Sequence, residues 1–246
     1  MTTNSDARPP LDTAMVFAAG LGTRMRPITD RIPKPLVTIG GKTMLDHMLD
    51  RLADGGVSRA IVNVHHLPDQ IETHLQPRKR PEIIISDERE KLLDQGGGIR
   101  KVLPLIGGAD FFICNTDAVW LEGPQSTIAA MRQAWRPDDM DVLLLVAATS
   151  GAVGVDWPGD FHMAPDGRLM KRGERDVSAF VYAGVGIIKA SLFEDAKDEV
   201  FRLAPYFFRA AEAGRLYGLR LNGLWLHVGT PEAIEAAERA YARPAA

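Results

Sequence analysis

The segment from Met15 to Pro35 limits most strongly what this chain can fold into. It begins with a short apolar run, which is typical of a buried parallel strand over residues 14–18. The run breaks at Gly20 and Gly22, and glycine lets backbone N–H groups approach a ligand closely. Arg24 and Arg26 follow the glycines. A strand that leads into a glycine-rich turn with nearby cations predicts a phosphate-binding loop.

Two common phosphate loops do not fit this segment. A Walker A loop needs a glycine, four intervening residues and then Gly-Lys-Ser/Thr, and this segment contains no such sequence. A dinucleotide-binding turn needs a third glycine and a helix that starts at the turn, but Met25 takes the glycine position and Pro27 follows. An NAD-dependent oxidoreductase is therefore disfavoured. Because Pro33 and Pro35 also interrupt any helix, we predict an extended polar loop that presents Lys34 and returns to a strand at residues 36–39.

Strand and helix patterns alternate along the first 150 residues. The spacing of apolar residues predicts further strands at 60–64, 82–85, 111–114 and 141–147, and helices at 44–53, 69–75, 98–105 and 127–135. After Ser150 it predicts a hairpin at 161–171, strands at 181–188, 216–221 and 224–228, and helices at 205–213 and 231–241. We expect an α/β fold of one domain, residues 13–246, with a doubly wound, mostly parallel sheet and a mixed C-terminal half. Residues 1–12 are expected to form a disordered tail.

Composition excludes several classes of protein. The chain has 246 residues with a net charge of −3, so no basic surplus indicates a nucleic-acid partner. No apolar run reaches membrane-spanning length, and no membrane partner is expected. The only cysteine, Cys114, lies in an apolar strand pattern and fits a reducing compartment, which predicts a cytoplasmic location. We expect a monomer or a small homo-oligomer.

Three polar segments follow predicted strands, and ligands bind at the carboxyl ends of the strands in such sheets. The glycine loop, residues 87–98 and residues 115–117 should therefore meet at one cleft. Asp117 offers a carboxylate to Mg²⁺; the alternative is an Asx turn or a helix cap. The three glycines at 96–98 offer a flat surface for a base, with Gln95 adding an amide; the alternative is a flexible loop.

The run Ala-Ala-Gly-Leu-Gly-Thr-Arg-Met-Arg-Pro followed by Pro-Lys-Pro-Leu resembles the signature loop of the sugar-1-phosphate nucleotidylyltransferases. The resemblance implies that the loop wraps a nucleoside triphosphate, that Arg24 holds the leaving pyrophosphate and that Lys34 contacts phosphates at the reacting centre. With Asp117, these are the expected catalytic residues. The expected nucleotide-binding residues are Ala18, Ala19, Gly20, Gly22, Thr23, Arg24, Asp94, Gln95, Gly96, Gly97 and Asn115.

The resemblance also implies a catalytic magnesium ion on Asp117. The run from Trp225 to Pro231 is similar to the family's Trp-x-Asp-x-Gly-Thr element, whose aspartate is a second metal ligand, but this chain has His227 there. Neutral imidazole is a poorer ligand for Mg²⁺ than a carboxylate. Four interpretations stay open: His227 ligates the metal and favours Mn²⁺, water completes the metal shell on Asp117, His227 binds a phosphate, or His227 is only packed.

For the sugar, the resemblance implies contacts in the C-terminal half from Glu174, Tyr182 and Gly184, with the match at Glu174 the poorest. The run Leu-Leu-Asp-Gln-Gly-Gly-Gly-Ile is most similar to the short branch of uridylyltransferases that use UTP and N-acetylmuramate α-1-phosphate in bacterial cell-wall recycling. Alternative branches use glucose-1-phosphate or mannose-1-phosphate. Because His227 replaces a metal carboxylate, a nucleotide-binding regulatory relative without turnover is an alternative of another class.

Overall fold

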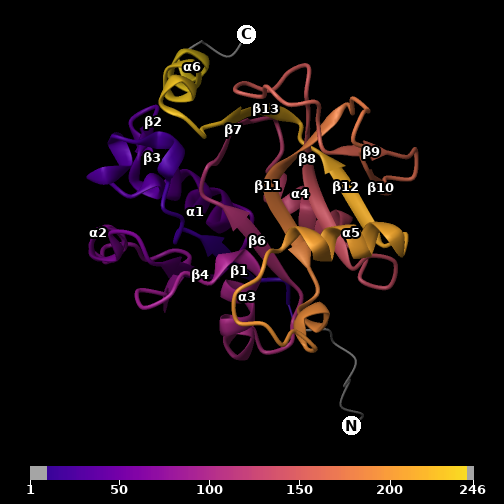
Figure 1. Cartoon of the computed structure of the whole chain (residues 1–246), viewed down its shortest axis with the longest axis horizontal. Coiled ribbons are helices and arrows are strands. Elements are labelled where there is room, and N and C mark those ends of the chain that lie inside the picture. Colours follow the sequence, from indigo (N-terminus) through magenta and orange to yellow (C-terminus); the bar gives the residue numbers. More distant parts are fainter. Residues whose placement is uncertain (1–9, 243–246) are drawn as a thin grey trace.

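The computed structural model describes residues 10–242 (Figure 1). Up to residue 150 its strands are β1 (Thr13–Phe17), β2 (Thr38–Ile39), β3 (Lys42–Thr43), β4 (Arg59–Val64), β5 (Glu82–Asp87), β6 (Phe111–Asn115), β7 (Ala118–Glu122) and β8 (Val142–Ala148). Its helices there are α1 (Met44–Asp54), α2 (Pro68–Leu75), α3 (Asp94–Ile106) and α4 (Thr127–Ala134). The later elements are β9 (Phe161–Met163), β10 (Leu169–Lys171), β11 (Phe180–Ile188), α5 (Ala204–Glu212), β12 (Leu216–Arg220), β13 (Gly223–His227) and α6 (Pro231–Tyr241).

Nine of the described strands form one mixed sheet. Its main path runs β12, β8, β11, β6, β1, β4, β5, with the β9–β10 hairpin attached to β11. Strands β6, β1, β4 and β5 are parallel neighbours, and β12 is parallel to β8. Strand β11 is antiparallel to both β6 and β8. The predicted α/β fold with a mostly parallel sheet and a mixed C-terminal half is confirmed.

Helices cover both faces of the sheet, because successive residues of each strand point to opposite faces. On β1, Ala14 and Val16 pack in one core with residues of α1 and α4, while Met15 packs in a second core with residues of α3 and α5. Figure 1 shows the sheet passing between these helices. Both sides of the central strands are therefore buried, which explains why they read as continuous apolar runs.

Strands β7 and β13 form a separate two-stranded antiparallel sheet beside the main sheet. Val119 and Leu226 of this small sheet pack with α6 and with Met25 of the glycine loop in a third core, while Trp120 and Trp225 pack in the first core. The sequence patterns did not predict β7. Its pairing matters for the site, because Ala118 lies opposite His227 in the register, which brings His227 back to the end of β6.

Several local predictions need correction. The predicted extended loop is instead a series of 3₁₀ turns, at Thr23–Met25, Ile28–Asp30 and Lys34–Leu36, and only Thr38–Ile39 of the strand predicted at 36–39 is a strand. The predicted helix at 98–105 begins at Asp94, so residues 96–98 are helical and buried. Of the predicted tail, residues 1–9 lie outside the described residues, whereas the carbonyl of Asp12 accepts hydrogen bonds from the backbone N–H groups of Ser58 and Arg59. None of the described helices is long and apolar enough to cross a membrane.

Candidate active site

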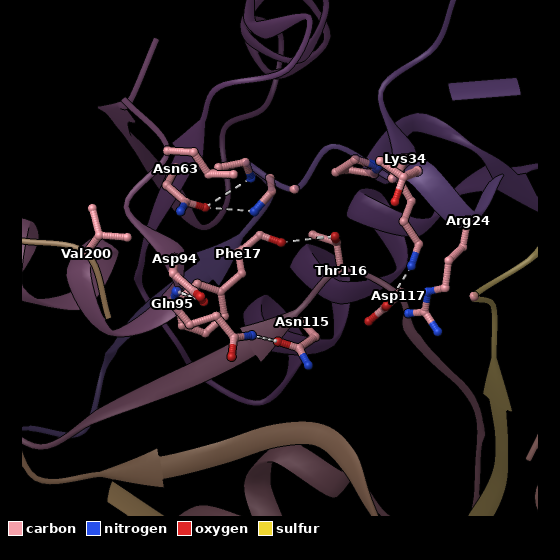
Figure 2. Close-up of a pocket in the computed structure, with 18 residues that line it drawn as sticks. Phe17, Arg24, Lys34, Asn63, Asp94, Gln95, Asn115, Thr116, Asp117 and Val200 are labelled. Atoms are coloured by element: carbon pink, nitrogen blue, oxygen red, sulfur yellow. Dashed lines mark hydrogen bonds and ion pairs between the residues drawn. The ribbon is translucent and has the colours of Figure 1, made fainter. Parts of the chain in front are cut away.

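A cavity of about 530 Å³ opens at the carboxyl ends of β1, β4 and β6 (Figure 2). It is lined by Phe17, Ala18, Ala19, Gly20, Gly22, Thr23, Arg24, Lys34, Pro35, Asn63, Leu92, Asp94, Gln95, Asn115, Thr116, Asp117, Val200 and Gly229. The glycine loop, residues of the 87–98 segment and residues 115–117 thus meet as predicted. Side chains of parallel strands converge here because all the strands end at the same edge of the sheet.

The glycine loop is held in a fixed shape from within. Gly22 has a φ of 63°, and a Cβ atom there would lie 2.8 Å from Cγ2 of Thr29, so only glycine fits. The Thr29 hydroxyl donates to the carbonyl of Gly22 at 2.8 Å, and Nε2 of His66 donates to the carbonyl of Thr29 at 2.8 Å. A Cβ on Gly20, by contrast, would meet no atom within 4 Å. The space at Gly20 is therefore open toward the cavity.

A buried polar pair fixes the start of the loop. Asn63 at the end of β4 accepts hydrogen bonds through Oδ1 from the backbone N–H groups of Ala18, at 2.8 Å, and Ala19, at 3.3 Å. Its Nδ2 donates to Oε1 of Glu88 at 2.8 Å, and Oε2 of Glu88 accepts from the N–H of Leu93 at 3.2 Å. Asn63 and Glu88 are 4% and 2% exposed, so water does not compete freely for these bonds. Sequence reasoning missed this pair, because a single polar residue within or just after an apolar strand is common and forms no distinctive pattern.

Charged groups gather at the opposite end of the cavity from Val200 (Figure 2). Nζ of Lys34 lies 2.7 Å from Oδ2 of Asp117, and their side chains are 14% and 24% exposed. Burial alone would raise the pKa of Asp117, but the charge and hydrogen bond of the Lys34 ammonium, together with His227 and Arg24, lower it below its ordinary value. Asp117 is therefore ionised at neutral pH, and the predicted residues Arg24, Lys34 and Asp117 form one cluster.

His227 belongs to the same cluster and lies against two tryptophan rings. Its ring centroid is 5.2 Å from that of Trp157 and 5.4 Å from that of Trp225. Burial lowers its pKa; the Asp117 carboxylate opposes that shift, and Lys34 and other nearby cations reinforce it. The imidazole is therefore neutral near pH 7, and a neutral ring nitrogen can bind a metal or a hydrogen-bonding ligand.

Amide groups mark the other end of the cavity. Nε2 of Gln95 donates to Oδ1 of Asn115 at 2.8 Å, and both side chains line the cavity (Figure 2). The glycines that were expected to present a flat surface to a base lie in the first turn of α3, and Gly96 and Gly97 are not among the residues that line this cavity. A Cβ on Gly96 would lie 2.3 Å from the Phe201 ring. These glycines make room for a neighbouring segment of the chain.

The three residues expected to contact a sugar have different surroundings. Gly184 has a φ of 83°, and a Cβ there would lie 2.6 Å from Cβ of Ala118 and 3.3 Å from Cβ of Asn115, so it is next to the site. The Tyr182 hydroxyl is buried without a hydrogen-bond partner among the described residues, and burial raises its pKa. Glu174 is exposed and does not line the cavity. It lies in a turn whose backbone carbonyls, including its own, accept hydrogen bonds from Arg172.

The donors present do not form a metal site by themselves. In the described part of the chain, no three Asp, Glu, His or Cys side chains are grouped so that they could hold an ion. Asp117 supplies one carboxylate, with His227 close enough to shift its pKa. Mg²⁺ is commonly held by one or two carboxylates together with substrate phosphates. This donor set therefore fits a metal that arrives with a phosphate-bearing substrate.

Comparisons with known proteins agree with this geometry. Residues 14–212 match the model of the MobA-like NTP transferase domain. The chain is 44% identical over 229 residues to the N-acetylmuramate alpha-1-phosphate uridylyltransferase of Caulobacter vibrioides, covering 92% of this chain and 95% of that protein. It is 32% identical over 220 residues to the protein of the same name from Neisseria meningitidis serogroup B, covering 88% and 93%.

Solved structures show the same fold at low identity. A UDP-glucose pyrophosphorylase complexed with UDP-glucose superposes with a TM-score of 0.75 at 16% identity, covering 94% of this chain and 98% of that one. A putative glucose-1-phosphate thymidylyltransferase from Bacillus anthracis superposes with a TM-score of 0.77 at 14% identity, covering 95% and 96%. Together with the family match, these findings show that the chain belongs to the MobA-like NTP transferase family and is a nucleotidyltransferase that makes nucleotide sugars.

Proposed function

We propose that the protein joins UTP and N-acetylmuramate α-1-phosphate to give UDP-N-acetylmuramate and pyrophosphate, as part of cell-wall recycling in the cytoplasm. The observation that carries the proposal is the convergence of the glycine loop, Arg24, Lys34 and Asp117 on one cavity. The choice of substrates is supported by the 44% identity to the Caulobacter relative over nearly the full length of both chains.

The reaction is a displacement at phosphorus. An oxygen of the sugar phosphate bonds to the α-phosphorus of UTP, and the bond from that phosphorus to the bridging oxygen breaks, which releases pyrophosphate. The attacking phosphate is already an anion, so no side chain has to remove a proton from it. The protein must therefore align two anions and stabilise the charge that develops between them.

The residues of the charged cluster bind different phosphates of the two substrates. Lys34, held beside Asp117, places an ammonium at the reacting phosphates and reduces their repulsion. Arg24 lies in the same wall of the cavity and holds the departing pyrophosphate. Gly20 leaves open space beside the loop for the phosphate chain, and backbone N–H groups of the loop donate to it.

A divalent cation fits this site in one arrangement. Asp117 would hold Mg²⁺ or Mn²⁺ together with phosphate oxygens, and the bound cation would neutralise charge on the transferred phosphoryl group. His227 would complete the shell or donate a hydrogen bond to a phosphate. On the sugar side, Gly184 packs against Ala118 and Asn115, which places β11 close beside the end of β6, where the sugar would bind. Tyr182 and Gly184 remain the predicted sugar contacts.

A pyrophosphate-release screen tests the proposal directly. The purified full chain is incubated with each of UTP, dTTP, GTP and CTP against the α-1-phosphates of N-acetylmuramate, glucose and mannose, with Mg²⁺ or Mn²⁺. We expect the highest kcat/KM with UTP and N-acetylmuramate α-1-phosphate. A preference for glucose- or mannose-1-phosphate would overturn the choice of sugar, and nucleotide binding without turnover in every pair would support a regulatory role.

A further inference from the structure

A segment late in the chain forms a wall of the nucleotide cavity. Residues 198–201 precede α5 and cross the N-terminal turn of α3. The N–H groups of Gly96 and Gly97 both donate to the carbonyl of Phe201, at 2.9 and 3.3 Å. Nη1 of Arg100 donates to the carbonyl of Asp198 at 2.9 Å. These bonds tie the segment to α3 through backbone atoms on either side of Val200.

The glycines of α3 are required by this crossing. A Cβ on Gly97 would lie 2.2 Å from the carbonyl oxygen of Glu199, closer than atoms can approach. The ion pair between Lys91 and Glu199, with N–O at 2.5 Å, adds little, because both side chains are more than half exposed. Close backbone packing, rather than this surface pair, therefore sets the position of the segment.

Val200 is the residue of this segment that faces the cavity. Its side chain lines the cavity although 46% of the residue is exposed, and it lies on the side of Asp94 and Asn63 (Figure 2). Arg24, Lys34 and Asp117 lie at the far side of the same view. The cavity thus has a charged end suited to phosphates and an end where apolar Val200 accompanies the amide groups of Asn63 and Gln95.

We propose that Val200 packs against the base of the bound nucleoside triphosphate, and that the close crossing at Gly96 and Gly97 holds it there. This inference rests on the proposed binding of a nucleoside triphosphate. With the phosphates at Lys34 and Arg24, the nucleoside extends toward Gln95 and Val200. A planar base that covers the exposed methyl groups of Val200 gains apolar contact.

The test compares UTP with inorganic triphosphate, which carries the phosphates but no nucleoside. Calorimetry with Mg²⁺ measures the Kd of both for the wild-type chain and for Val200→Ala. We expect Val200→Ala to raise the Kd for UTP about fivefold, because the substitution removes the apolar area of two methyl groups. The Kd for inorganic triphosphate should be unchanged. Gly97→Ala, which displaces the segment, is expected to give the same pattern. Val177→Ala, at a residue 77% exposed and outside the cavity, is the matched control and should change neither Kd.

The outcomes separate the role of Val200 from the proposed binding of a nucleoside triphosphate. If wild type binds UTP and Val200→Ala binds it equally well, the role of Val200 is refuted while the proposed reaction stands. If Val200→Ala weakens the binding of UTP and of triphosphate equally, the substitution only disturbs the structure of the cavity, and the inference also fails. If wild-type protein binds neither UTP nor any other nucleoside triphosphate, the proposed function itself fails.

Discussion

Replacing Asn63 by Ala should cost more stability than any single polar substitution on the surface. The change removes two backbone bonds from Ala18 and Ala19 and the bond to Glu88, which lie at 2.8, 3.3 and 2.8 Å. Each such bond contributes about 1 kcal/mol net, and leaving a buried acceptor unpaired costs a further ~1–3 kcal/mol. Ala18 and Ala19 line the cavity, so water that enters the space of the missing amide would pair with their N–H groups. The main uncompensated group is then Glu88, which is 2% exposed.

We therefore expect Asn63→Ala to lower the free energy of unfolding by about 3 kcal/mol, measured by urea titration with the m-value checked for constancy. Asn222→Ala, at an exposed position, is the matched control and should change it by less than about 0.5 kcal/mol. Asn63→Asp keeps an acceptor for Ala18 but faces a second carboxylate at Glu88. Its stability should recover as the pH falls, because like charges raise the pKa of a carboxyl in the folded state. If Asn63→Ala were no more destabilising than Asn222→Ala, the interpretation of the buried pair would be refuted.

Three further substitutions test the charged cluster and the fold. Lys34→Ala should reduce kcat/KM at least ~100-fold while the circular dichroism spectrum stays unchanged. The control Lys42→Ala, at a lysine outside the cavity, should not reduce kcat/KM. Near-normal turnover of Lys34→Ala would contradict the assignment of Lys34 as a catalytic residue. His227→Asp adds a carboxylate beside Asp117 and should raise the apparent Mg²⁺ affinity in a rate titration, and unchanged affinity and rate would exclude a role at the metal. Burial opposes ionisation of Asp141, but hydrogen bonds from Lys189 and Arg215 lower its pKa, so its contribution to stability is present at neutral pH and lost as the pH falls through the folded pKa. Asp141→Asn should thus be less stable at pH 7, with a deficit that shrinks below about pH 4; a deficit independent of pH would argue against this.

The central sheet could be predicted from the sequence because its strands are buried on both faces. Continuous apolar runs at β1, β4, β6 and β8 carry that signal, and α6 was predicted at its observed bounds. Strand β7 was missed because it follows β6 after the short turn at Thr116 and Asp117, and because its partner strand β13 lies far along the chain. Local patterns do not contain such long-range pairing. The position of His227 beside Asp117 depends on it, so that contact was not predictable from spacing alone.

The cavity residues near the glycine loop were predictable for a similar reason. Parallel strands end at one edge, so polar residues after β1 and β6 had to meet there. Asn63 and Val200 were not found, because neither stands in a segment with a distinctive pattern. Asn63 is one polar residue inside an apolar strand, and Val200 lies in an irregular segment whose path is set by its bonds to α3.

The glycines show why residue type alone did not separate ligand contacts from internal contacts. Gly20, Gly22 and Gly97 all stand in sequence patterns that favour phosphate or base binding. Gly22 is required by its φ of 63° and by Thr29, and Gly97 by the Glu199 carbonyl at 2.2 Å from its missing Cβ. Of these three glycines, only Gly20 could carry a Cβ atom that meets no other atom within 4 Å. A glycine beside open space leaves room for a ligand, whereas a glycine against backbone atoms fixes the wall that the ligand touches. In this chain the wall so fixed ends in Val200, so the glycine run of α3 acts on the nucleotide through the segment it accommodates.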